Sequence, residues 1–448
     1  MSTNNSTIVG GGLVGSLLAC YLAKRGHQVD VYESRPDMRK AGYIGGRSIN
    51  LALSVRGWTA LEKIGLKEEI EKISIPMHGR MIHAVSGEKS FQPYGKDDEA
   101  IYSVSRGELN KRLIELADSF DNVNFHFNEL CEKVNFQDTS IEFVNFENHE
   151  KHKVNATRIF GTDGAFSKVR QAFMALPRFN YSQNYIEHGY KELHIPANAQ
   201  GEHQLEKNAL HIWPRGSFMM IALPNLDGSF TCTMFVPFEG EDAFDDLATE
   251  KHVVDFFEKY FPDAIPLMPN YIEDFFKNPT SGLVTVRCNQ WFQNNVCILG
   301  DASHAIVPFF GQGMNAGFED VRILDELMQA ENENWEKVFP QFNTLRKPDT
   351  DAIAQMALDN FIEMRDLVAD DHFLQKKRIE KLIMADESNQ YLSLYSGVSF
   401  SNERYSEVYK KGLKQNELLE ELVLIKDIDN KLKSEEIKKK IHQKINGG

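Results

Sequence analysis

The sequence has few of the features that mark secreted, membrane-embedded or nucleic-acid-binding proteins. Its 448 residues include only five cysteines, an odd number without a C-x-x-C pair. Neither a disulfide framework nor a zinc site is therefore indicated, and a reducing, cytoplasmic location is expected. Positive charge is also in deficit, since the net charge of −15 argues against nucleic acid or an anionic membrane as the main partner. Low-complexity segments and internal repeats are absent.

Long uncharged runs are missing, with one exception at the N-terminus. Residues 1–23 carry no charged side chain, and a membrane-spanning helix needs about 20 apolar residues. However, no Lys or Arg precedes the run and glycines interrupt it, so a buried strand followed by a turn and a helix explains it better than a signal peptide or a span. The length predicts two or three domains.

The chain opens with the pattern of a β-α-β unit. A short buried strand is expected over Thr7–Val9, a helix over Leu13–Lys24, and a second strand over Gln28–Tyr32. Such a unit implies a parallel sheet and a fold of the α/β class.

A G-x-G-x-x-G fingerprint lies between this first strand and helix. Gly10 permits a tight turn, Gly12 lets the backbone approach a pyrophosphate, and Gly15 lets the helix pack on the strand. Amide groups at the helix N-terminus then face the phosphates. Glu33 ends the second strand, where a carboxylate accepts ribose hydroxyls. A purely structural glycine turn is the alternative.

Two further glycine motifs point to a longer ligand. The strand Val296–Leu299 ends at Gly300, after which Asp301 is placed to accept a hydroxyl from a ribityl chain; an ordinary helix N-cap is the alternative. A helix beginning near Gly313 would direct its N-terminus at the pyrimidine edge of a flavin. Asp163-Gly164 reads by itself as a turn. Together the three motifs predict FAD, because a dehydrogenase that binds only NAD would not need the third.

The remaining chain divides into strand-rich and helical zones. A loop is expected over Arg39–Asn50 and a helix over Val55–Ile64, and the S-x-x-E spacing from Ser105 to Glu108 predicts a capped helix over Leu109–Ala117. Residues 75–105 look β-like. Strands are expected over Val123–Phe127, Cys131–Phe136 and Ile141–Phe146, as an antiparallel patch. Residues of about 180–290 resemble a sheet that roofs a cavity, and the chain is helical from about Trp335.

We therefore predict an α/β fold with a Rossmann-type FAD-binding domain built from discontinuous segments, an inserted β-sheet substrate domain and a helical C-terminal region. The expected ranges are 1–75, 100–178 and 285–335 for the FAD domain, 76–99 and 179–284 for the substrate domain, and 336–448 for the helical region.

The final forty residues are rich in Lys and Glu. Apolar residues recur there at roughly helical spacing, at Leu418, Leu422, Ile425, Ile428 and Leu432. A solvated helix that packs on its own chain is the simpler interpretation, and a homodimer contact is the alternative.

These motifs resemble those of the single-component (class A) flavoprotein aromatic hydroxylases. Within that family, the similarity is closest to the members that hydroxylate L-kynurenine. It covers residues 8 to about 410 and is carried by RSINLALSVRG at 47–57, GRMIHAVSG at 79–87, PYG at 93–95, SVSR at 103–106, GDASHAIVPFFGQGMNAGFED at 300–320 and DNFIEMR at 359–365.

The resemblance implies a specific reaction and a specific site. In that family a flavin hydroperoxide inserts one oxygen ortho to the amine of L-kynurenine, NADPH is the reductant, and the product feeds tryptophan catabolism or quinolinate and NAD synthesis. By resemblance, Arg80 and Tyr395 hold the amino-acid carboxylate, and Tyr94 and Asn360 complete the substrate site. The positions that match FAD contacts are Val14, Glu33, Arg35, Ala52, Arg106, Leu130, Asp301, Met314 and Asn315.

Without the family, the same residues read more plainly. Arg80 would be a surface or salt-bridged residue, Tyr94 a packing residue, Asn360 a helix-surface amide and Tyr395 a core aromatic. An arginine nevertheless suits bidentate capture of a carboxylate. His304 suggests a general base, but a histidine directly after the glycine-aspartate turn is more often structural.

The chemistry explains why no general base stands out. The ortho amine of an aniline already donates its lone pair to the ring, so the protein has only to align the ring and exclude water. Pro308, Phe309 and Phe310 are expected to form a dry wall beside the flavin. Animal relatives carry a hydrophobic C-terminal membrane segment, whereas residues 432–448 could not span a bilayer, so no anchoring is expected.

Two other functions remain open at this point. One is a related hydroxylase acting on a phenol or an anthranilate-like ring. The other is a non-catalytic FAD- or NAD-binding module. The carboxylate clamp at Arg80 and Tyr395 favours the amino-acid substrate over both.

Overall fold

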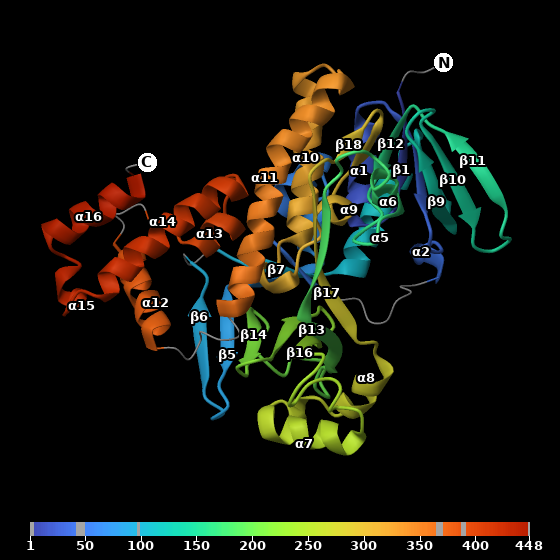
Figure 1. Ribbon diagram of the computed structural model, residues 1–448. Helices are drawn as coiled ribbons and strands as arrows, with labels where there is room; N and C mark the ends of the chain where they lie inside the picture. Colours follow the sequence, from blue (N-terminus) through green and yellow to red (C-terminus); the bar gives the residue numbers. More distant parts are fainter. Residues whose placement is uncertain (1–3, 42–49, 96–98, 364–370, 387–390, 447–448) are drawn as a thin grey trace.

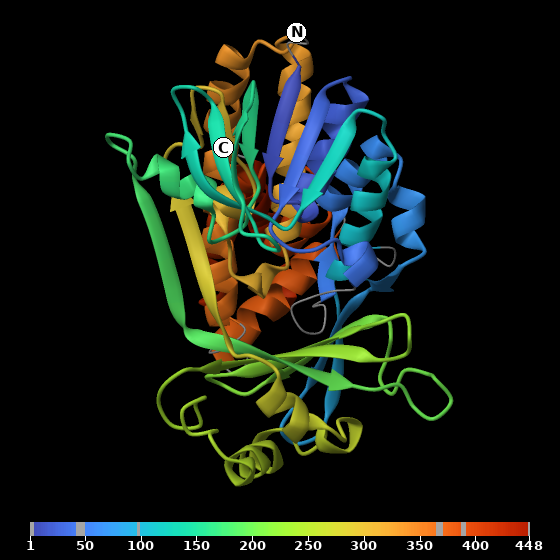
Figure 2. The ribbon, with the colours of Figure 1, turned by 90° about the vertical axis from the view of Figure 1, so that its right-hand side faces the viewer.

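Two large sheets organise the chain. The computed structural model describes residues 4–41, 50–95, 99–363, 371–386 and 391–446. A six-stranded sheet lies above a seven-stranded sheet in the view of Figure 2, and helices from the C-terminal half run beside both. The α/β class expected from the sequence is confirmed.

The six-stranded sheet contains the nucleotide-binding pattern. Its order is β18-β19-β12-β1-β2-β8, and every neighbouring pair is parallel except β18 and β19. The strands are β18 (Phe292–Gln293), β19 (Val296–Ile298), β12 (Arg158–Gly161), β1 (Asn5–Val9), β2 (Gln28–Glu33) and β8 (Val123–Phe127). The predicted β-α-β opening is thus confirmed, with α1 (Leu13–Lys24) between β1 and β2.

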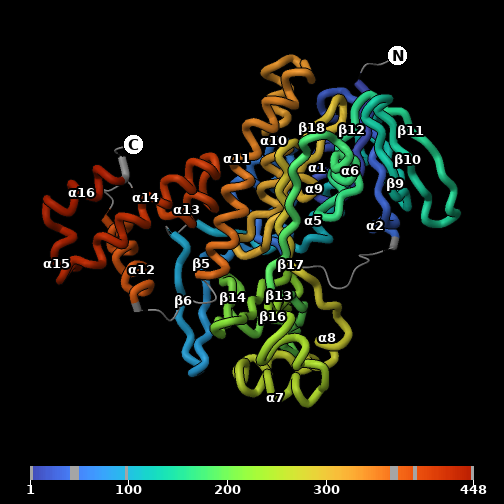
Figure 3. The backbone as a smooth tube through the Cα atoms, in the orientation of Figure 1, coloured from blue at the N-terminus to red at the C-terminus, as the bar shows by residue number. Residues whose placement is uncertain are grey.

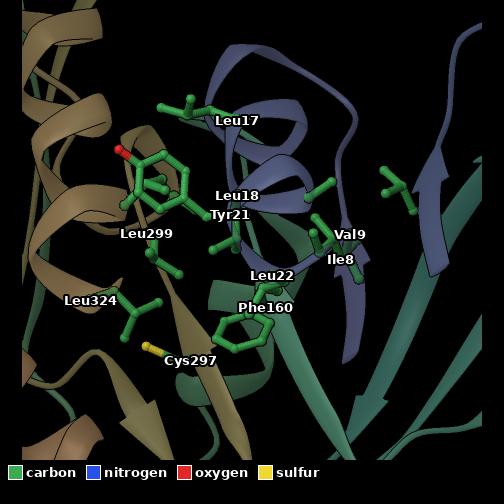
Figure 4. Packing of buried hydrophobic residues seen from close by; sticks show 14 of the residues in the cluster. Ile8, Val9, Leu17, Leu18, Tyr21, Leu22, Phe160, Cys297, Leu299 and Leu324 are labelled. Carbon is green, nitrogen blue, oxygen red and sulfur yellow. The ribbon is translucent and has the colours of Figure 1, made fainter. Parts of the chain in front are cut away.

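The core of this part forms where α1 packs on the sheet. Figure 4 shows Leu18 and Leu22 of α1 beside Ile8 and Val9 of β1, with Phe160 of β12 close by. None of these side chains is more than 3% exposed. Burial on both faces explains why the central strands read as continuous apolar runs.

One predicted pairing was wrong. Val123–Phe127 does not belong to an antiparallel patch, because it forms β8 and pairs with β2 in parallel. The antiparallel sheet contains only β9 (Glu129–Asn135), β10 (Ser140–Asn145) and β11 (Lys151–Asn155). A helix precedes β8, and a helical crossover delivers a strand in parallel orientation, so the connection, not the alternation of side chains, determines its partner.

A small sheet joins the two large ones. It has the order β3-β7-β4, with β3 (Asn50–Leu53), β7 (Ile101–Ser105) and β4 (Ser74–Met77). The helices of this region are α2 (Met38–Ala41), α3 (Val55–Ile64), α4 (Lys67–Glu71) and α5 (Arg106–Asp118). The Ser105 side chain caps α5 by accepting the amide of Glu108, as the capping-box spacing predicts. Most of the loop expected over Arg39–Asn50, residues 42–49, lies outside the described residues.

The seven-stranded sheet has the order β17-β13-β16-β15-β14-β5-β6. Its strands are β17 (Ser281–Cys288), β13 (Tyr181–Ile195), β16 (Phe230–Pro237), β15 (Met219–Pro224), β14 (Ala209–Pro214), β5 (Gly79–His83) and β6 (Lys89–Pro93). The helices α7 (Glu250–Tyr260), η1 (Ile265–Leu267) and α8 (Tyr271–Lys277) pack against one face. The hairpin β5–β6 joins this sheet from a distant part of the sequence through parallel pairing with β14.

Helices dominate from residue 301 onwards. They are α9 (Asp301–His304), η2 (Pro308–Phe310), α10 (Gly313–Ala330), α11 (Trp335–Ile362), α12 (Asp371–Met384), α13 (Leu394–Ser399), α14 (Tyr405–Val423), α15 (Ile428–Lys431) and α16 (Glu435–Asn446); the short α6 (Lys168–Phe173) follows β12. Figures 1 and 3 place α12 and α14–α16 at one end of the molecule and β9–β11 at the other.

The C-terminal tail packs against its own chain. Leu418, Leu422 and Ile428 are buried in one apolar cluster with Ile379 and Ile441, and Ile425 and Leu432 pack at its margin. This arrangement agrees with the simpler of the two interpretations of the tail. No helix of the described residues is both long and apolar enough to cross a membrane.

Candidate active site

Four neighbouring strands end together at the site. β1, β2, β12 and β19 are parallel and adjacent, so their carboxyl ends share one edge of the sheet. The glycine fingerprint follows β1, Glu33 ends β2, Asp163-Gly164 follows β12 and Gly300-Asp301 follows β19. In open α/β sheets this edge is where ligands bind. The three motifs, which begin at Gly10, Asp163 and Gly300, therefore meet at this edge of the sheet, as predicted.

The fingerprint glycines leave room for a ligand and not for side chains. Gly10 has φ +103°, and a Cβ there would lie 2.6 Å from the Thr162 carbonyl oxygen. A Cβ on Gly15 would lie 1.9 Å from the carbonyl oxygen of Gly10. A Cβ on Gly12 would meet no protein atom within 4 Å. The open side of the loop is therefore at Gly12, at the N-terminus of α1, where a pyrophosphate belongs.

Glu33 is fixed beside this loop. Its carboxylate accepts hydrogen bonds from the Gly11 amide at 2.8 Å and from the Arg35 amide and Nε at 3.0 and 2.8 Å. Burial opposes the charged form, but the hydrogen bonds and the charge of Arg35 outweigh it and lower the pKa of Glu33. The ionised carboxylate lines a cavity together with Gly12, Arg35 and Arg106, which suits a nucleotide ribose.

Asn110 is a residue of this cavity that sequence reasoning missed. Its Nδ2 donates to the Gly11 carbonyl at 3.2 Å, while its buried Oδ1 has no hydrogen-bond partner within the described ranges. The residue lies in the middle of α5, where nothing local marks an asparagine as functional. Only the packing of α5 against α1 brings it to the glycine loop.

Asp163 has a clear local role. Its carboxylate accepts from the Ser167 hydroxyl at 2.5 Å and from the amides of Lys168 and Val169 at 2.6 and 3.2 Å, and so caps α6. Burial raises its pKa. The Asp163 side chain therefore has the local role expected of a turn residue, and the Asp163 backbone packs against Gly10.

The Gly300 turn is held by a buried carboxylate. Gly300 has φ +58° and is itself the N-cap of α9, so Asp301 is the first helical residue, with an exposed side chain, and is not the N-cap. The Gly300 amide donates to Asp320 Oδ2 at 3.0 Å, and His304 Nε2 lies 2.5 Å from the same oxygen. His304 is 3% exposed. Its ion pair supports the structural interpretation over a general base.

The first turn of α10 is tied to β3. Asn315 Nδ2 donates to the carbonyl oxygens of Ala52 and Gly311 at 2.8 and 3.0 Å, and its Oδ1 accepts from the Ser54 amide at 3.0 Å. Gly313 and Met314 are partly exposed at the N-terminus of this helix. Val14 contacts the Cα side of both Gly300 and Gly317 and so joins α1 to the same corner. Leu130 lies at the start of β9.

Two of the three residues expected to form an apolar wall are buried. Pro308, Phe309 and Phe310 form the 3-10 turn η2; the two phenyl rings are 8% and 7% exposed, whereas Pro308 is exposed. The Phe309 ring stacks on Phe361 with 4.2 Å between centroids. Asn360 Nδ2 donates to the Phe309 carbonyl at 2.6 Å. Asn360 is 8% exposed, so the interpretation of a helix-surface amide was wrong.

An arginine and two tyrosines converge beside this wall. The Arg80 guanidinium lies 4.8 Å from the Tyr395 ring centroid and 5.6 Å from that of Tyr94. The two phenol rings stack at 4.9 Å, and Tyr395 also stacks on Phe310 at 5.6 Å. Arg80 comes from β5 and Tyr94 directly follows β6 of the same hairpin, whereas Tyr395 comes from α13, far along the chain.

Two donor atoms of this cluster are buried. In the described part of the chain, neither the Tyr94 hydroxyl nor Arg80 Nε has a hydrogen-bond partner, and both are buried. Burial raises the pKa of Tyr94 and of Tyr395, so both phenols keep their protons at neutral pH. A cation flanked by two hydroxyl donors is suited to a carboxylate.

Comparisons with known proteins agree with this geometry. A family profile described as "FAD binding domain" matches residues 4–335. A kynurenine 3-monooxygenase of Flavobacterium johnsoniae is 48% identical over 435 residues, which are 97% of this chain and 97% of that protein. The kynurenine 3-monooxygenase of Sus scrofa is 47% identical over 403 residues, covering 89% of this chain and 84% of its own length.

Solved structures support the fold. The tetrameric form of 2-methyl-3-hydroxypyridine-5-carboxylic acid oxygenase aligns with a TM-score of 0.68 at 18% identity, over 84% of this chain and 96% of the other. The p-nitrophenol 4-monooxygenase of Pseudomonas putida aligns with a TM-score of 0.67 at 18% identity, over 92% and 97%. At such identities the likeness concerns the fold alone.

Proposed function

The chain belongs to the kynurenine 3-monooxygenase family of FAD-binding monooxygenases, and on that premise we propose that it converts L-kynurenine to 3-hydroxy-L-kynurenine. The balanced reaction consumes the substrate, NADPH, a proton and O2, and yields the hydroxylated ring, NADP+ and water. When bound, FAD supplies the redox chemistry that links NADPH to oxygen. The remaining work belongs to the protein, which binds, orients and keeps water out.

The observation that carries the proposal is the donor cluster of Arg80, Tyr94 and Tyr395. A half-buried guanidinium beside two phenol hydroxyls matches the α-carboxylate of an amino acid. Bound there, the substrate would direct its aromatic ring past Phe310, which stacks on Tyr395, toward the flavin. The clamp therefore determines both the affinity for the substrate and the position of its aromatic ring relative to the flavin.

The wall of η2 positions the ring and excludes water. Phe309 and Phe310 present buried aromatic faces, and a low-dielectric, dry site favours oxygen transfer over release of peroxide. Asn360 acts on this wall through its hydrogen bond to the Phe309 carbonyl. The ortho amine of kynurenine makes the ring electron-rich, so proton removal from the substrate is unnecessary, in keeping with a His304 committed to Asp320.

We propose that the motif residues hold FAD along the sheet edge. Glu33 takes the adenosine ribose, Gly12 the pyrophosphate and Asp301 the ribityl chain, while the N-terminus of α10 faces the pyrimidine edge. The remaining proposed contacts are Gly10, Val14, Gly15, Arg35, Ala52, Arg106, Leu130, Asp163, Gly313, Met314 and Asn315. The division into an FAD domain, a β-sheet substrate domain and a helical C-terminal region, a cytoplasmic location and a homodimer are part of the same proposal.

Product analysis with three substrates tests the proposal. Purified FAD-loaded protein is supplied with NADPH and air, and with L-kynurenine, anthranilate or a simple phenol. Formation of 3-hydroxykynurenine in near-stoichiometric ratio to NADPH is the expected result. Efficient hydroxylation of anthranilate or phenol with kynurenine untouched would instead assign the related hydroxylase activity. NADPH that is not consumed with any ring would leave only a flavin-binding protein.

A further inference from the structure

Two buried residues outside the proposed binding site link the clamp to the flavin side of the molecule. Arg56, on α3, is 0% exposed, and Tyr405, the first residue of α14, is also 0% exposed. Arg56 is part of the RSINLALSVRG stretch at 47–57, whereas Tyr405 lies outside the sequence motifs. Arg56 bonds to both α13, which carries Tyr395, and α10, whose N-terminus faces the proposed flavin site, and Tyr405 bonds to the residue that precedes α10. Figure 1 shows α10 beside α11.

The Arg56 guanidinium bonds to several elements at once. Its NH1 donates to Glu319 Oε1 of α10 at 2.6 Å. Its Nε donates to the Val398 carbonyl, in the last turn of α13, at 3.4 Å, and its NH2 donates to the Glu403 carbonyl at 2.5 Å. The ring of Tyr405 lies 3.7 Å from the guanidinium carbon. One side chain therefore fastens the end of the clamp helix to the flavin-side helix.

The Tyr405 hydroxyl extends this link to the wall. It donates to Gln312 Oε1 at 2.8 Å, and the Ser54 hydroxyl lies 3.4 Å from the same oxygen. Gln312 is 1% exposed and is the N-cap residue of α10. It directly follows Phe310 and Gly311, so the hydroxyl holds the turn that joins the wall to the helix facing the flavin.

A second contact closes the path between the same two segments. Tyr395, at the start of α13, stacks on Phe310 at 5.6 Å. The clamp helix thus touches the wall directly through rings at its beginning, and is bonded to α10 through Arg56 at its end. Ring stacking alone tolerates sliding, whereas the directional hydrogen bonds of Arg56 and Tyr405 define the register.

We propose that Arg56 and Tyr405 are positioning residues that keep the carboxylate clamp in register with the flavin-side turn at residues 310–315. This inference rests on the proposed function. A shift of about 1 Å between ring and flavin is enough to impair a reaction that depends on alignment. Loss of the link therefore leaves the substrate bound but misaligned, and NADPH oxidation then yields hydrogen peroxide (NADPH, a proton and O2 giving NADP+ and H2O2) in place of product.

A purely stabilising role explains the contacts of Arg56 and Tyr405 less well than a positioning role. Glu319 already pairs with Arg346 at 2.7 Å and with Arg322 at 3.3 Å, so its charge is compensated without Arg56. The Tyr405 bond to Gln312 is a single neutral hydrogen bond. Its removal is a small perturbation of the fold, yet it acts directly on the turn beside the flavin.

The test compares Tyr405→Phe with Tyr409→Phe in the FAD-loaded enzyme. Tyr405→Phe removes the bond to Gln312 and keeps the ring over Arg56. Tyr409 is the matched control, because it lies one turn further along α14 and its hydroxyl donates to Asp359 at 3.3 Å on the exposed side. The measured quantities are the ratio of peroxide to hydroxylated product per NADPH, the dissociation constant of kynurenine, and hydrogen exchange of residues 308–315 with and without kynurenine.

In Tyr405→Phe we expect the peroxide-to-product ratio to rise about three- to tenfold, the factor that one ordinary hydrogen bond provides. The kynurenine dissociation constant should change less than about twofold. We expect kynurenine to slow exchange of residues 308–315 in the wild type and not in Tyr405→Phe. Arg56→Lys, which keeps the charge without the fork, should uncouple more strongly.

The outcomes separate the two proposals. A Tyr405→Phe enzyme as tightly coupled as Tyr409→Phe, with wild-type protection of residues 308–315, would overturn the positioning role and leave the proposed function intact. Equal loss of substrate affinity and coupling would also overturn it, because that pattern indicates damage to the clamp itself. A wild-type enzyme that forms no hydroxykynurenine would overturn both.

Discussion

Replacement of Arg80 by methionine should separate carboxylate binding from every other property of the enzyme. Methionine preserves most of the side-chain volume beside the Tyr94 and Tyr395 rings and removes the charge together with the N–H donors of the guanidinium. A hydrogen bond to a charged group contributes about 1.5–3 kcal/mol. Two such bonds are lost while the tyrosine hydroxyls survive, so we expect a net loss of about 3–4 kcal/mol, or a decrease of kcat/KM by two to three orders of magnitude.

The assay is a cycle between enzyme and substrate. The wild type and Arg80→Met are each measured with L-kynurenine and with kynuramine, which lacks the carboxylate, by following product formation. The Arg80→Met substitution and the loss of the substrate carboxylate should each lower kcat/KM by about the same factor. Their combination should lower it little further, because each change removes the same interaction. Arg80→Lys should recover part of the loss. If Arg80→Met impaired kynuramine as strongly as kynurenine, the carboxylate clamp would be refuted.

Three further predictions follow from the same geometry. Gly12→Ala should fold normally, because its Cβ meets nothing within 4 Å, but it should bind FAD about tenfold or more weakly, whereas Gly15→Ala, with a Cβ 1.9 Å from a carbonyl oxygen, should lose both stability and FAD binding. FAD titration and thermal melts distinguish the two variants, and equal FAD affinities in Gly12→Ala and the wild type would contradict this account of the loop. Burial opposes ionisation of Glu319, but Arg346 and Arg56 lower its pKa, so the unfolded chain binds its proton more readily and stability should fall as the pH drops below about 4.5. Glu319→Gln should cost about 3–5 kcal/mol at pH 7 and flatten this acid limb, because two buried arginines lose a partner; an unchanged slope between pH 5 and 3 would argue against it. Asn360→Ala should weaken coupling more than kynurenine binding, measured as product per NADPH, since its amide holds the Phe309 carbonyl; an enzyme that loses affinity and remains coupled would show direct substrate contact instead.

The nucleotide-binding part of the fold can largely be predicted from local sequence patterns. The bounds of α1 and α3 are those that the apolar spacing predicts, and the capping box places α5 correctly. These features depend on interactions within a few residues. β8 was assigned to the wrong sheet because its partner depends on the helical crossover before it, and alternation of side chains carries no information about the partner.

The site could be predicted only in part, because some of its contacts also depend on elements distant in sequence. The glycine motifs converge because parallel strands end at a common edge, which a sequence can predict. The clamp is different, since Tyr395 on α13 is far in sequence from the β5–β6 hairpin that carries Arg80 and Tyr94, and only the resemblance to a family brought the three residues together in advance. Asn110 and Tyr405 lie outside every predicted motif, and Arg56 lies in the 47–57 motif without a predicted role, because the contacts of all three arise from packing between helices distant in sequence.

The central claim is that this chain is a flavoprotein whose reduced state is used to hydroxylate kynurenine. Anaerobic stopped-flow reduction of the FAD-loaded protein by NADPH, with and without L-kynurenine and followed by one addition of oxygen, tests it most directly. We predict that kynurenine strongly accelerates loss of the flavin absorbance and that oxygen then yields close to one 3-hydroxykynurenine per flavin. Equal reduction rates and no hydroxykynurenine would contradict the account and assign a different ring as the substrate.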